Sequence, residues 1–208
     1  MEAKIFAESG NAEAMKWDKK LAGQGFAYAQ HNLGLMYDNG QGVFQNDVEA
    51  MKWYKKVADQ GFSYAQYNLG VMYLNGEGVS QNYAEAIRWF RKAADQGFSY
   101  AQYILGVMYH DGEGVSQNYA EAMRWYKKAA DQGDICAQHN LAYMYAKGQV
   151  VPKNLIKAYV WFSIAYASGD ETSKENLEII NSKMTPEEIA KAQKEASELW
   201  EKINNPKK

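Results

Sequence analysis

Hydrophobic positions along the chain follow a helical period inside a longer repeat. In the segment 62–97, Ala65, Leu69 and Met72 lie at i, i+4 and i+7, the spacing of one buried stripe on a helix of 3.6 residues per turn. After a break rich in glycine, Ala86 and Phe90 begin a second stripe with the same spacing. The pattern predicts two amphipathic helices in this segment, one on each side of the break.

The pair of stripes recurs every 36 residues. The period is marked by five tryptophans: Trp17, Trp53, Trp89, Trp125 and Trp161. Self-similarity at a period of about 20 to 50 residues indicates a repeat array, in which each unit buries its apolar face only against its neighbours. The sequence therefore predicts an all-α fold of tandem 36-residue helix-turn-helix repeats that stack into a solenoid.

Capping residues mark the predicted start of the first helix in each repeat. Ser63 and Gln66 match a capping box, and Phe62 and Tyr67 match the hydrophobic staple that often accompanies it. We therefore expect the helix to begin at Ser63, with the Gln66 side chain folded back toward the cap.

Glycine and asparagine mark the rest of the unit. Gly70 interrupts the first helix pattern at a cost of roughly 1 kcal/mol against alanine, so its recurrence predicts close approach by another backbone. Gly76 suits the left-handed conformation at the end of this helix. Asn82, with Glu85 three positions later, is the expected cap of the second helix.

The two ends of the array differ. Thr185, Pro186 and Glu188 predict a strong helix start near the C-terminus. This terminal helix carries an apolar stripe: Ile189, Ala192, Ala196, Leu199, Trp200 and Ile203. We expect a repeat domain over residues 1–169, with full repeats starting near Tyr28, Tyr64, Tyr100 and Cys136, and C-terminal capping helices over residues 170–208.

The first repeat of the pattern is only a half. Its second helix is expected around residues 12–22, while the register places its first helix before residue 1. A half-repeat leaves an uncovered apolar edge. Three interpretations are open. The chain is a piece of a longer array, or residues 1–9 fold back over the edge, or a partner covers the edge, and this partner can be a second copy of the chain.

Composition excludes several classes of function. A formal net charge of -2 provides no basic field, so binding to nucleic acid is not expected. The longest apolar run, residues 158–167, is about half of what a membrane-spanning helix needs, so direct membrane insertion is not expected. The N-terminus lacks the apolar stretch of a signal peptide, which favours the cytoplasm for the chain as written, or the periplasm or exterior if a signal has been removed.

The repeated residues resemble those of a known family. The motif Ala-Gln-x-Asn-Leu-Gly-x-Met-Tyr is followed by Gly-x-Gly-Val and then by Glu-Ala-x-x-Trp-Tyr/Phe-x-Lys-Ala-Ala-Asp-Gln-Gly, and this succession is similar to the Sel-one-like repeat (SLR) family of tetratricopeptide-like solenoids. The resemblance implies a right-handed α/α superhelix, found in bacterial proteins, whose first helices line a concave groove and hold protein partners. Secreted members with a disulfide in each repeat differ from this chain, whose only cysteine is Cys136.

The resemblance also selects candidate binding residues on the first helices. They form one stripe in each repeat: Tyr28, His31, Tyr64, Tyr67, Val71, Asn75, Tyr100, Tyr103, Val107, His110, Asp111, His139 and Tyr143. Several of these positions differ between repeats while the core stripe barely changes, and tyrosine is well suited to interfaces. The alternative is that Tyr67 and Tyr103 are held in the helix-start staples, and that Tyr64 and Tyr100 only fill gaps between adjacent repeats.

Catalytic chemistry has little support in the sequence. Gly76-x-Gly78 follows no strand and precedes no Gly-Lys-Ser/Thr, so a helix-connecting turn is favoured over a phosphate loop. His31 and His139 stand three repeats apart, about 25 Å or more, which is too far to share a metal. We expect no enzyme activity, cofactor or metal.

The leading hypothesis is a non-catalytic adaptor that holds a peptide or partner protein across Tyr64, Tyr67, Tyr100 and Tyr103. A carbohydrate-binding module of the cell envelope is one alternative, because aromatic side chains with Asn and Asp also hold sugars. A structural segment of a larger repeat assembly is the other, because of the half-repeat.

Overall fold

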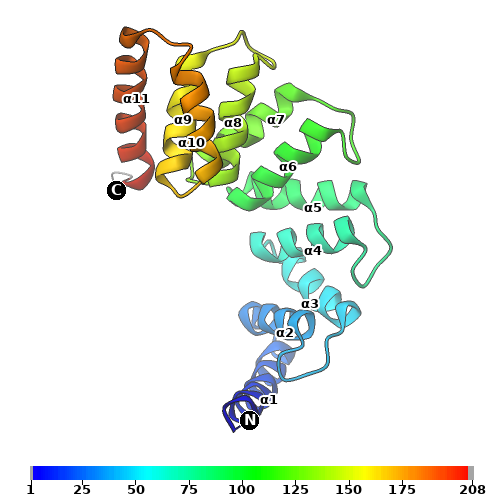
Figure 1. Cartoon of the computed structure of the whole chain (residues 1–208). Helices are drawn as coiled ribbons and strands as arrows, with labels where there is room; N and C mark the ends of the chain where they lie inside the picture. The colour runs from blue at the N-terminus through cyan, green and yellow to red at the C-terminus, as the bar shows by residue number, and fades with distance from the viewer. Residues whose placement is uncertain (1, 206–208) are drawn as a thin grey trace. The chain divides into compact units, whose positions relative to one another are not determined.

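A computed structural model describes the backbone of residues 2–205 and the side chains of residues 13–205. The described residues form eleven helices and no strand. Figure 1 shows how these helices follow one another along the chain. The helices are α1 (Glu2–Gly23), α2 (Ala27–Asn39), α3 (Asp47–Asp59), α4 (Ser63–Asn75), α5 (Tyr83–Asp95), α6 (Ser99–Asp111), α7 (Tyr119–Ala130), α8 (Ile135–Lys147), α9 (Leu155–Ala167), α10 (Glu171–Asn181) and α11 (Pro186–Asn204). The expected all-α fold is confirmed.

The helices belong to two compact units, an N-terminal unit (Met1–Phe98) and a C-terminal unit (Ser99–Lys208). In the N-terminal unit α2 packs against α3 and α4 packs against α5; in the C-terminal unit α6 packs against α7 and α8 against α9. The first helices of these pairs begin at residues 27, 63, 99 and 135, so the 36-residue helix pair is confirmed. The division between repeats and cap at residue 169 stays a prediction.

The core is made by the residues of the predicted stripes. Ala65, Leu69 and Met72 on α4 are buried, as are Ala86 and Phe90 on α5. The same leucine position is fully buried in every repeat, at Leu33, Leu69, Leu105 and Leu141. Because burying a leucine side chain contributes roughly 1.5–3 kcal/mol, this repeated contact is a main source of stability in each helix pair.

The recurring glycine of the first helix leaves space for an aromatic ring of the second helix. A Cβ atom placed on Gly70 would lie 2.5 Å from two ring atoms of Phe90, and the same clash would occur between Gly106 and Tyr126. The prediction that a backbone approaches Gly70 is therefore wrong. The close neighbour is the aromatic side chain of the second helix, which occupies the space that a methyl group on the glycine would need.

The predicted caps of the second helices are present. The Asn82 side chain accepts a hydrogen bond from the backbone N–H of Glu85, and Asn46, Asn118 and Asn154 cap α3, α7 and α9 in the same way. Gly76 ends α4 with φ of 77°, in the left-handed region that glycine favours. Each inter-helix turn is thus fixed by local hydrogen bonds.

The predicted capping box of the first helix is wrong. The N-cap residue of α4 is Phe62, no side chain caps the helix, and Gln66 is buried. The Gln66 side chain points toward the preceding helix, where its Nε2 donates to the carbonyl of Ala58 at 3.1 Å. Burial explains the difference, because an amide enclosed in the core must find partners there and not at an exposed helix end.

The buried glutamines form pairs with glutamines thirty residues later. Three pairs are present, in which Gln60, Gln96 and Gln132 donate to the Oε1 atoms of Gln30, Gln66 and Gln102 at 2.8, 2.7 and 2.7 Å. In the fourth repeat Ser168 stands at the second position. Gln138 is fully buried, and its Oε1 has no hydrogen-bond partner among the described residues.

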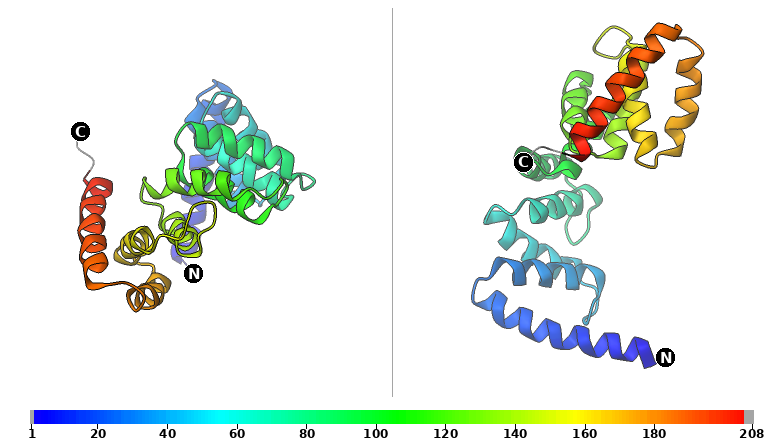
Figure 2. Two further views of the ribbon diagram at one scale, coloured as in Figure 1. Left: turned by 90° about the horizontal axis from the view of Figure 1, so that it is seen from above. Right: turned by 90° about the vertical axis from the view of Figure 1, so that its left-hand side faces the viewer.

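The first helix is longer than the half-repeat predicts. α1 runs without a break from Glu2 to Gly23, as Figure 2 shows, so the expectation that residues 1–9 fold back over the edge is wrong for residues 2–9; Met1 lies outside the described residues. Trp17 on this helix is 61% exposed, whereas Trp89, Trp125 and Trp161 are buried. The longer array and the covering partner stay predictions for this edge.

The C-terminal helices α10 and α11 both pack against α9. Thr185 and Glu188 form the predicted capping box of α11, with Pro186 at its first position. Ala192 and Ala196 are the buried residues of its stripe, and the larger stripe residues are half-buried. No helix in the described part of the chain has both the length and the apolar character that crossing a bilayer requires.

Replacing Ser168 with glutamine should stabilise the protein. Ser168 has φ of -86° and ψ of -2°, close to the -83° and 1° of Gln96, so a glutamine here adopts the same conformation and donates to Gln138 Oε1. One hydrogen bond to a buried acceptor contributes about 0.5–1.5 kcal/mol. We expect S168Q to raise the free energy of unfolding by about that amount in urea denaturation.

The control removes the acceptor. In a Gln138→Met background, S168Q should give no gain in the free energy of unfolding. An equal gain in both backgrounds would show that the stabilisation comes from elsewhere.

Candidate functional site

One pocket of the N-terminal unit is built from the predicted stripe of α2 and the start of α4. This α2–α4 pocket has a volume of about 450 Å³ and is lined by Tyr28, His31, Asn32, Leu35, Phe62 and Tyr64. The His31 ring lies 5.1 Å from the ring of Tyr64 and 5.9 Å from that of Tyr54. Burial lowers the pKa of His31, so the imidazole is neutral at pH 7 and the pocket has an aromatic, uncharged wall.

The remaining candidates of this unit lie outside the lining of the α2–α4 pocket. The Tyr67 ring packs 5.3 Å from that of Phe98 and 5.9 Å from that of Phe90, so Tyr67 joins the core to the next turn. Val71 is half-buried, and the exposed Asn75 donates to the Glu77 carboxylate at 2.9 Å. Tyr67 therefore packs against rings of its own unit, and its part in binding stays a prediction.

The C-terminal unit brings six predicted residues together in one pocket. This α6–α8 pocket has a volume of about 420 Å³ and is lined by Tyr103, Val107, His110, Asp111, Tyr126, His139, Asn140 and Tyr143. Tyr103, Val107, His110 and Asp111 come from α6, whereas His139 and Tyr143 come from α8. Tyr100, which is 59% exposed, is not part of this lining.

Two lining residues of the α6–α8 pocket were not among the candidates. Tyr126 comes from the second helix α7, at the core position that Phe90 fills one repeat earlier, and its ring also contacts Gly106. Asn140 repeats the positions of Asn32 and Asn68. The 36-residue recurrence of asparagine was the available signal for Asn140, whereas nothing in a core stripe reveals that the edge of Tyr126 reaches a pocket.

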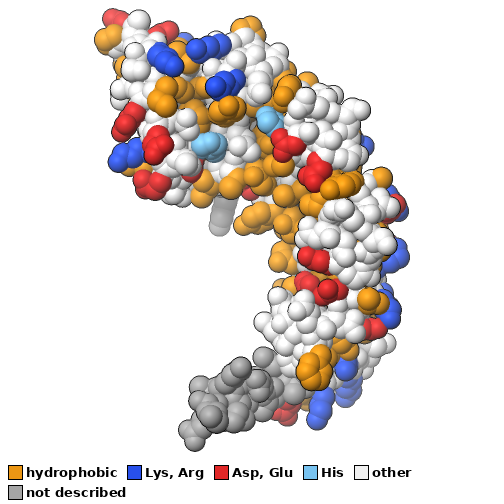
Figure 3. Space-filling model, turned by 45° about the vertical axis from the view of Figure 1, so that its right-hand side comes forward, with side chains coloured by type: hydrophobic (Ala, Val, Ile, Leu, Met, Phe, Trp, Pro, Cys, Tyr) orange, Lys and Arg blue, Asp and Glu red, His pale blue; other side chains and the backbone are white. Residues whose placement is uncertain are grey.

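The electrostatics of the α6–α8 pocket favour neutral hydrogen-bonding groups. Burial raises the pKa of Tyr103 and of Tyr126, so both phenols keep their protons and can donate. His110 Nδ1 lies 2.6 Å from the Asp111 carboxylate, so these two side chains form a hydrogen bond with each other. In Figure 3 the pale-blue histidine side chains lie among orange hydrophobic and red acidic ones. The surface is mixed, with large rings and polar edges.

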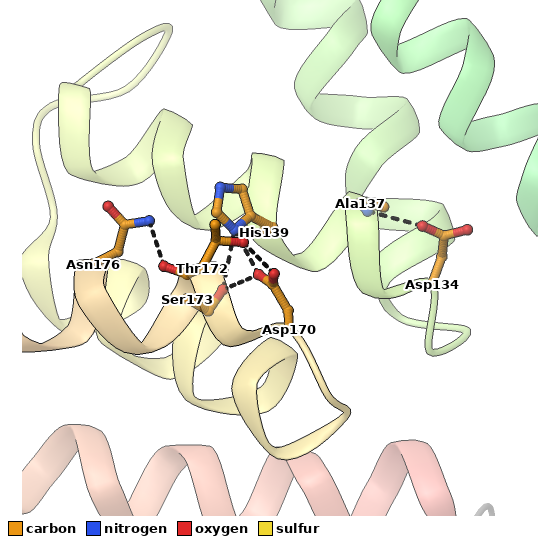
Figure 4. Close-up of polar contacts among 7 residues, drawn as sticks. All are labelled: Asp134, Ala137, His139, Asp170, Thr172, Ser173 and Asn176. Carbon is orange, nitrogen blue, oxygen red and sulfur yellow. Dashed lines mark hydrogen bonds and ion pairs between the residues drawn. The ribbon is translucent and has the colours of Figure 1, made fainter.

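His139 is held by the start of α10. Its Nδ1 lies 2.7 Å from Asp170 Oδ2 and 3.1 Å from Ser173 Oγ, and Figure 4 shows the imidazole above the carboxylate. Ser173 is fully buried and also bonds Asp170, as does Thr172. The cluster fixes the orientation of the His139 ring in the pocket wall.

The Asp170 carboxylate is stabilised in its charged form. Burial by itself raises the pKa of Asp170, but hydrogen bonds from Ser173, Thr172 and His139, together with the charge of His139, outweigh it and lower the pKa to about 2. At neutral pH Asp170 is therefore an anion that anchors both α8 and α10.

The lining groups are not arranged as a catalytic triad or as a metal site in the described part of the chain. Ser173 and Asp170 approach the same nitrogen of His139, so the imidazole does not stand between a hydroxyl and a carboxylate as acid–base catalysis by a triad requires. Cys136, beside Tyr103, is exposed, and partial burial raises the pKa of its thiol, which keeps it a weak nucleophile. The described residues contain no group of three or more His, Cys, Asp and Glu side chains suited to a metal.

The family comparison matches the repeats seen in the structure. Residues 27–62, 63–98, 99–134 and 137–170 each match the model of the Sel1 repeat. These four segments cover well over half of the chain. A comparison with curated proteins gives no match.

Several solved structures of bacterial proteins share the fold. A Sel1 repeat protein from Oxalobacter formigenes is 32% identical, with a TM-score of 0.77 over 94% of this chain and 80% of that chain. A protective antigen of uropathogenic Escherichia coli strains, which displays an SLR fold, is 43% identical with a TM-score of 0.77 over 78% of this chain, which spans only 35% of that protein. An immunity protein from Pseudomonas aeruginosa, 22% identical with a TM-score of 0.50 over 91% of this chain and 73% of that chain, shares the fold.

Stability should depend on pH through Asp170. Because its pKa in the folded chain, about 2, lies below the ordinary value of 3.8, the carboxylate stabilises the fold above pH 4 and loses this contribution as the pH falls toward 2. We expect Asp170→Asn to lower the melting temperature at pH 6 and to converge with the wild type near pH 2. Melting curves by circular dichroism between pH 2 and 7 measure this, and a constant difference across that range would contradict it.

Proposed function

This chain belongs to the Sel1 repeat family, and we propose that it is a non-catalytic scaffold whose first helices bind a peptide segment of a partner protein. The proposal places the main contacts in the α6–α8 pocket, with the α2–α4 pocket as a second contact site. It rests on the site geometry within each unit and on the residues that differ between repeats.

The observation that carries the proposal is the separation of two stripes on each first helix. One stripe holds a buried leucine at the same position in every repeat. The other lines the pockets and varies, since the position of His31 holds Tyr67, Tyr103 and His139 in later repeats. The exchange of His for Tyr changes the hydrogen-bonding groups that this stripe offers, so the variation supports recognition of a particular ligand.

The chemistry of the α6–α8 pocket suits a peptide. Tyr103 and Tyr143 offer large contact areas with little loss of rotamer entropy. The phenol groups and Asn140 can donate to and accept from backbone amides, and the Val107 side chain gives an apolar contact. A pocket of about 420 Å³ holds one or two side chains, not a globular domain.

Peptides selected on the full chain should test the proposal. A random dodecapeptide phage library panned against the protein should yield binders, whose dissociation constants are then measured by fluorescence anisotropy. Truncating two interface tyrosines removes about 1–3 kcal/mol of binding free energy, so the double variant Tyr103→Ala, Tyr143→Ala should weaken binding by about tenfold or more.

The matched control is Tyr166→Ala on α9, because Tyr166 is an exposed tyrosine outside the lining of both pockets. It should leave the dissociation constant unchanged, and circular dichroism should show native helix content for all variants. Equal weakening by Tyr166→Ala and by the pocket variant would contradict the proposal. Binding to a glycan array but to no peptide would support the carbohydrate alternative instead.

A further inference from the structure

A smaller pocket in the C-terminal unit adjoins the α6–α8 pocket and has a different chemical character. It has a volume of about 240 Å³, between the end of α8, the start of α9 and the end of α10. Its lining includes Tyr143, Leu155, Phe162, Ile179 and Ile180 together with Lys147, Lys153 and Lys183. We call it the lysine-rimmed pocket.

The apolar part of the lysine-rimmed pocket is accessible. Phe162 and Ile180 are buried and belong to the packing of α9 and α10, but Ile179 is 54% exposed. Leu155 at the start of α9 is half-buried. An exposed isoleucine beside a hollow of this size provides a surface on which one aliphatic or aromatic side chain of a ligand gains burial.

Three lysines contribute to the lining of this pocket beside the apolar residues. Lys147 ends α8, Lys153 precedes α9 and Lys183 follows α10, and all three are exposed. None of them has a carboxylate within 4 Å among the side chains of residues 13–205, in contrast to Lys127, whose Nζ lies 2.6 Å from Asp131. On a chain with a net charge of -2, three unpaired lysines around one pocket form a local positive site.

Tyr143 connects the two pockets, because its ring lines both the α6–α8 pocket and the lysine-rimmed pocket. The Lys147 Nζ atom lies 5.2 Å from the centre of this ring. A peptide that contacts Tyr143 from the α6–α8 pocket therefore reaches the lysines with its next residues.

We propose that the lysine-rimmed pocket binds an acidic part of the partner peptide, in which one apolar side chain is flanked by carboxylates. The apolar side chain lies on Leu155 and Ile179, and the carboxylates meet the three lysines. This inference rests on the proposed function for the identity of the ligand as a peptide. More than one carboxylate is required, because a single one leaves the other ammonium groups without a counter-charge.

The charge pattern determines selectivity. Each exposed ion pair contributes little by itself, roughly 0.2–1 kcal/mol, but two carboxylates of one ligand that meet the three lysines combine to about a tenfold preference for an acidic peptide over a neutral one. Because the pairs are exposed, the preference should decrease as salt screens the charges.

Methyl-detected NMR on the full chain tests the inference without knowledge of the natural partner. The probes are the blocked tripeptides Ac-Glu-Leu-Glu-NH₂ and Ac-Gln-Leu-Gln-NH₂, which differ in charge and match in shape. The methyl signals of Leu155, Ile179 and Ile180 report on the lysine-rimmed pocket, and those of Val107 report on the α6–α8 pocket. We expect Glu-Leu-Glu to shift the first group at about tenfold lower concentration than Gln-Leu-Gln.

The variant that tests the lysines is Lys147→Gln, Lys153→Gln, Lys183→Gln. It should reduce the preference for the acidic tripeptide to about twofold or less. The matched control, Lys174→Gln, Lys191→Gln, Lys194→Gln, changes the net charge by the same amount on exposed positions of α10 and α11 and should keep the preference.

Equal responses to the two tripeptides, or a preference that persists in the Lys147, Lys153, Lys183 variant, would overturn the inference. Shifts with inorganic phosphate as large as those with Glu-Leu-Glu would also overturn it, since the site then selects anions without the apolar side chain. The proposed function is judged separately: selected dodecapeptides that shift Val107 while both tripeptides act equally would support the scaffold and reject the acidic ligand.

Discussion

The packing of the helix pairs α2–α3, α4–α5 and α6–α7 depends on the contact between an aromatic ring of the second helix and a glycine of the first. In α8 the buried Ala142 stands at the glycine position. Phe90 packs against Gly70, and Tyr126 packs against Gly106, at distances that leave no room for a methyl group. This contact fixes which side of the first helix is covered. The uncovered side of the first helix stays available for a ligand. Tyr126 connects the packing to the pocket, because it packs against Gly106 and also lines the α6–α8 pocket.

The fold was largely predictable because its physical causes are local. Asn82 caps its helix and Gly76 ends the one before it, each through hydrogen bonds within a few residues, so short motifs reveal them. Gln66 was misread for the opposite reason. Its motif matches an exposed cap, while its true partners are Ala58 on α3 and Gln96 directly after α5, which only the folded chain brings near.

The candidate site was predictable in its first-helix part and hidden elsewhere. The 36-residue register placed Tyr103, Val107 and His139 on one stripe, and the structure brings them into one pocket. The contribution of Asp170 depends on the way α10 packs against α9, and that of Lys183 on the end of α10, where no repeat extends. A repeat pattern therefore identifies the common surface, but it misses the features that the non-repeated end adds to it.

We expect ligands to bind to the varying stripe of the first helices and not to the tryptophan-bearing second helices. A crystal structure of the full chain with a selected dodecapeptide distinguishes these two surfaces. Electron density for the peptide is expected along α6 and α8, in contact with Tyr103 and Tyr143. Density lying instead over Trp125 and Arg124 on α7, with the α6–α8 pocket empty, would contradict it.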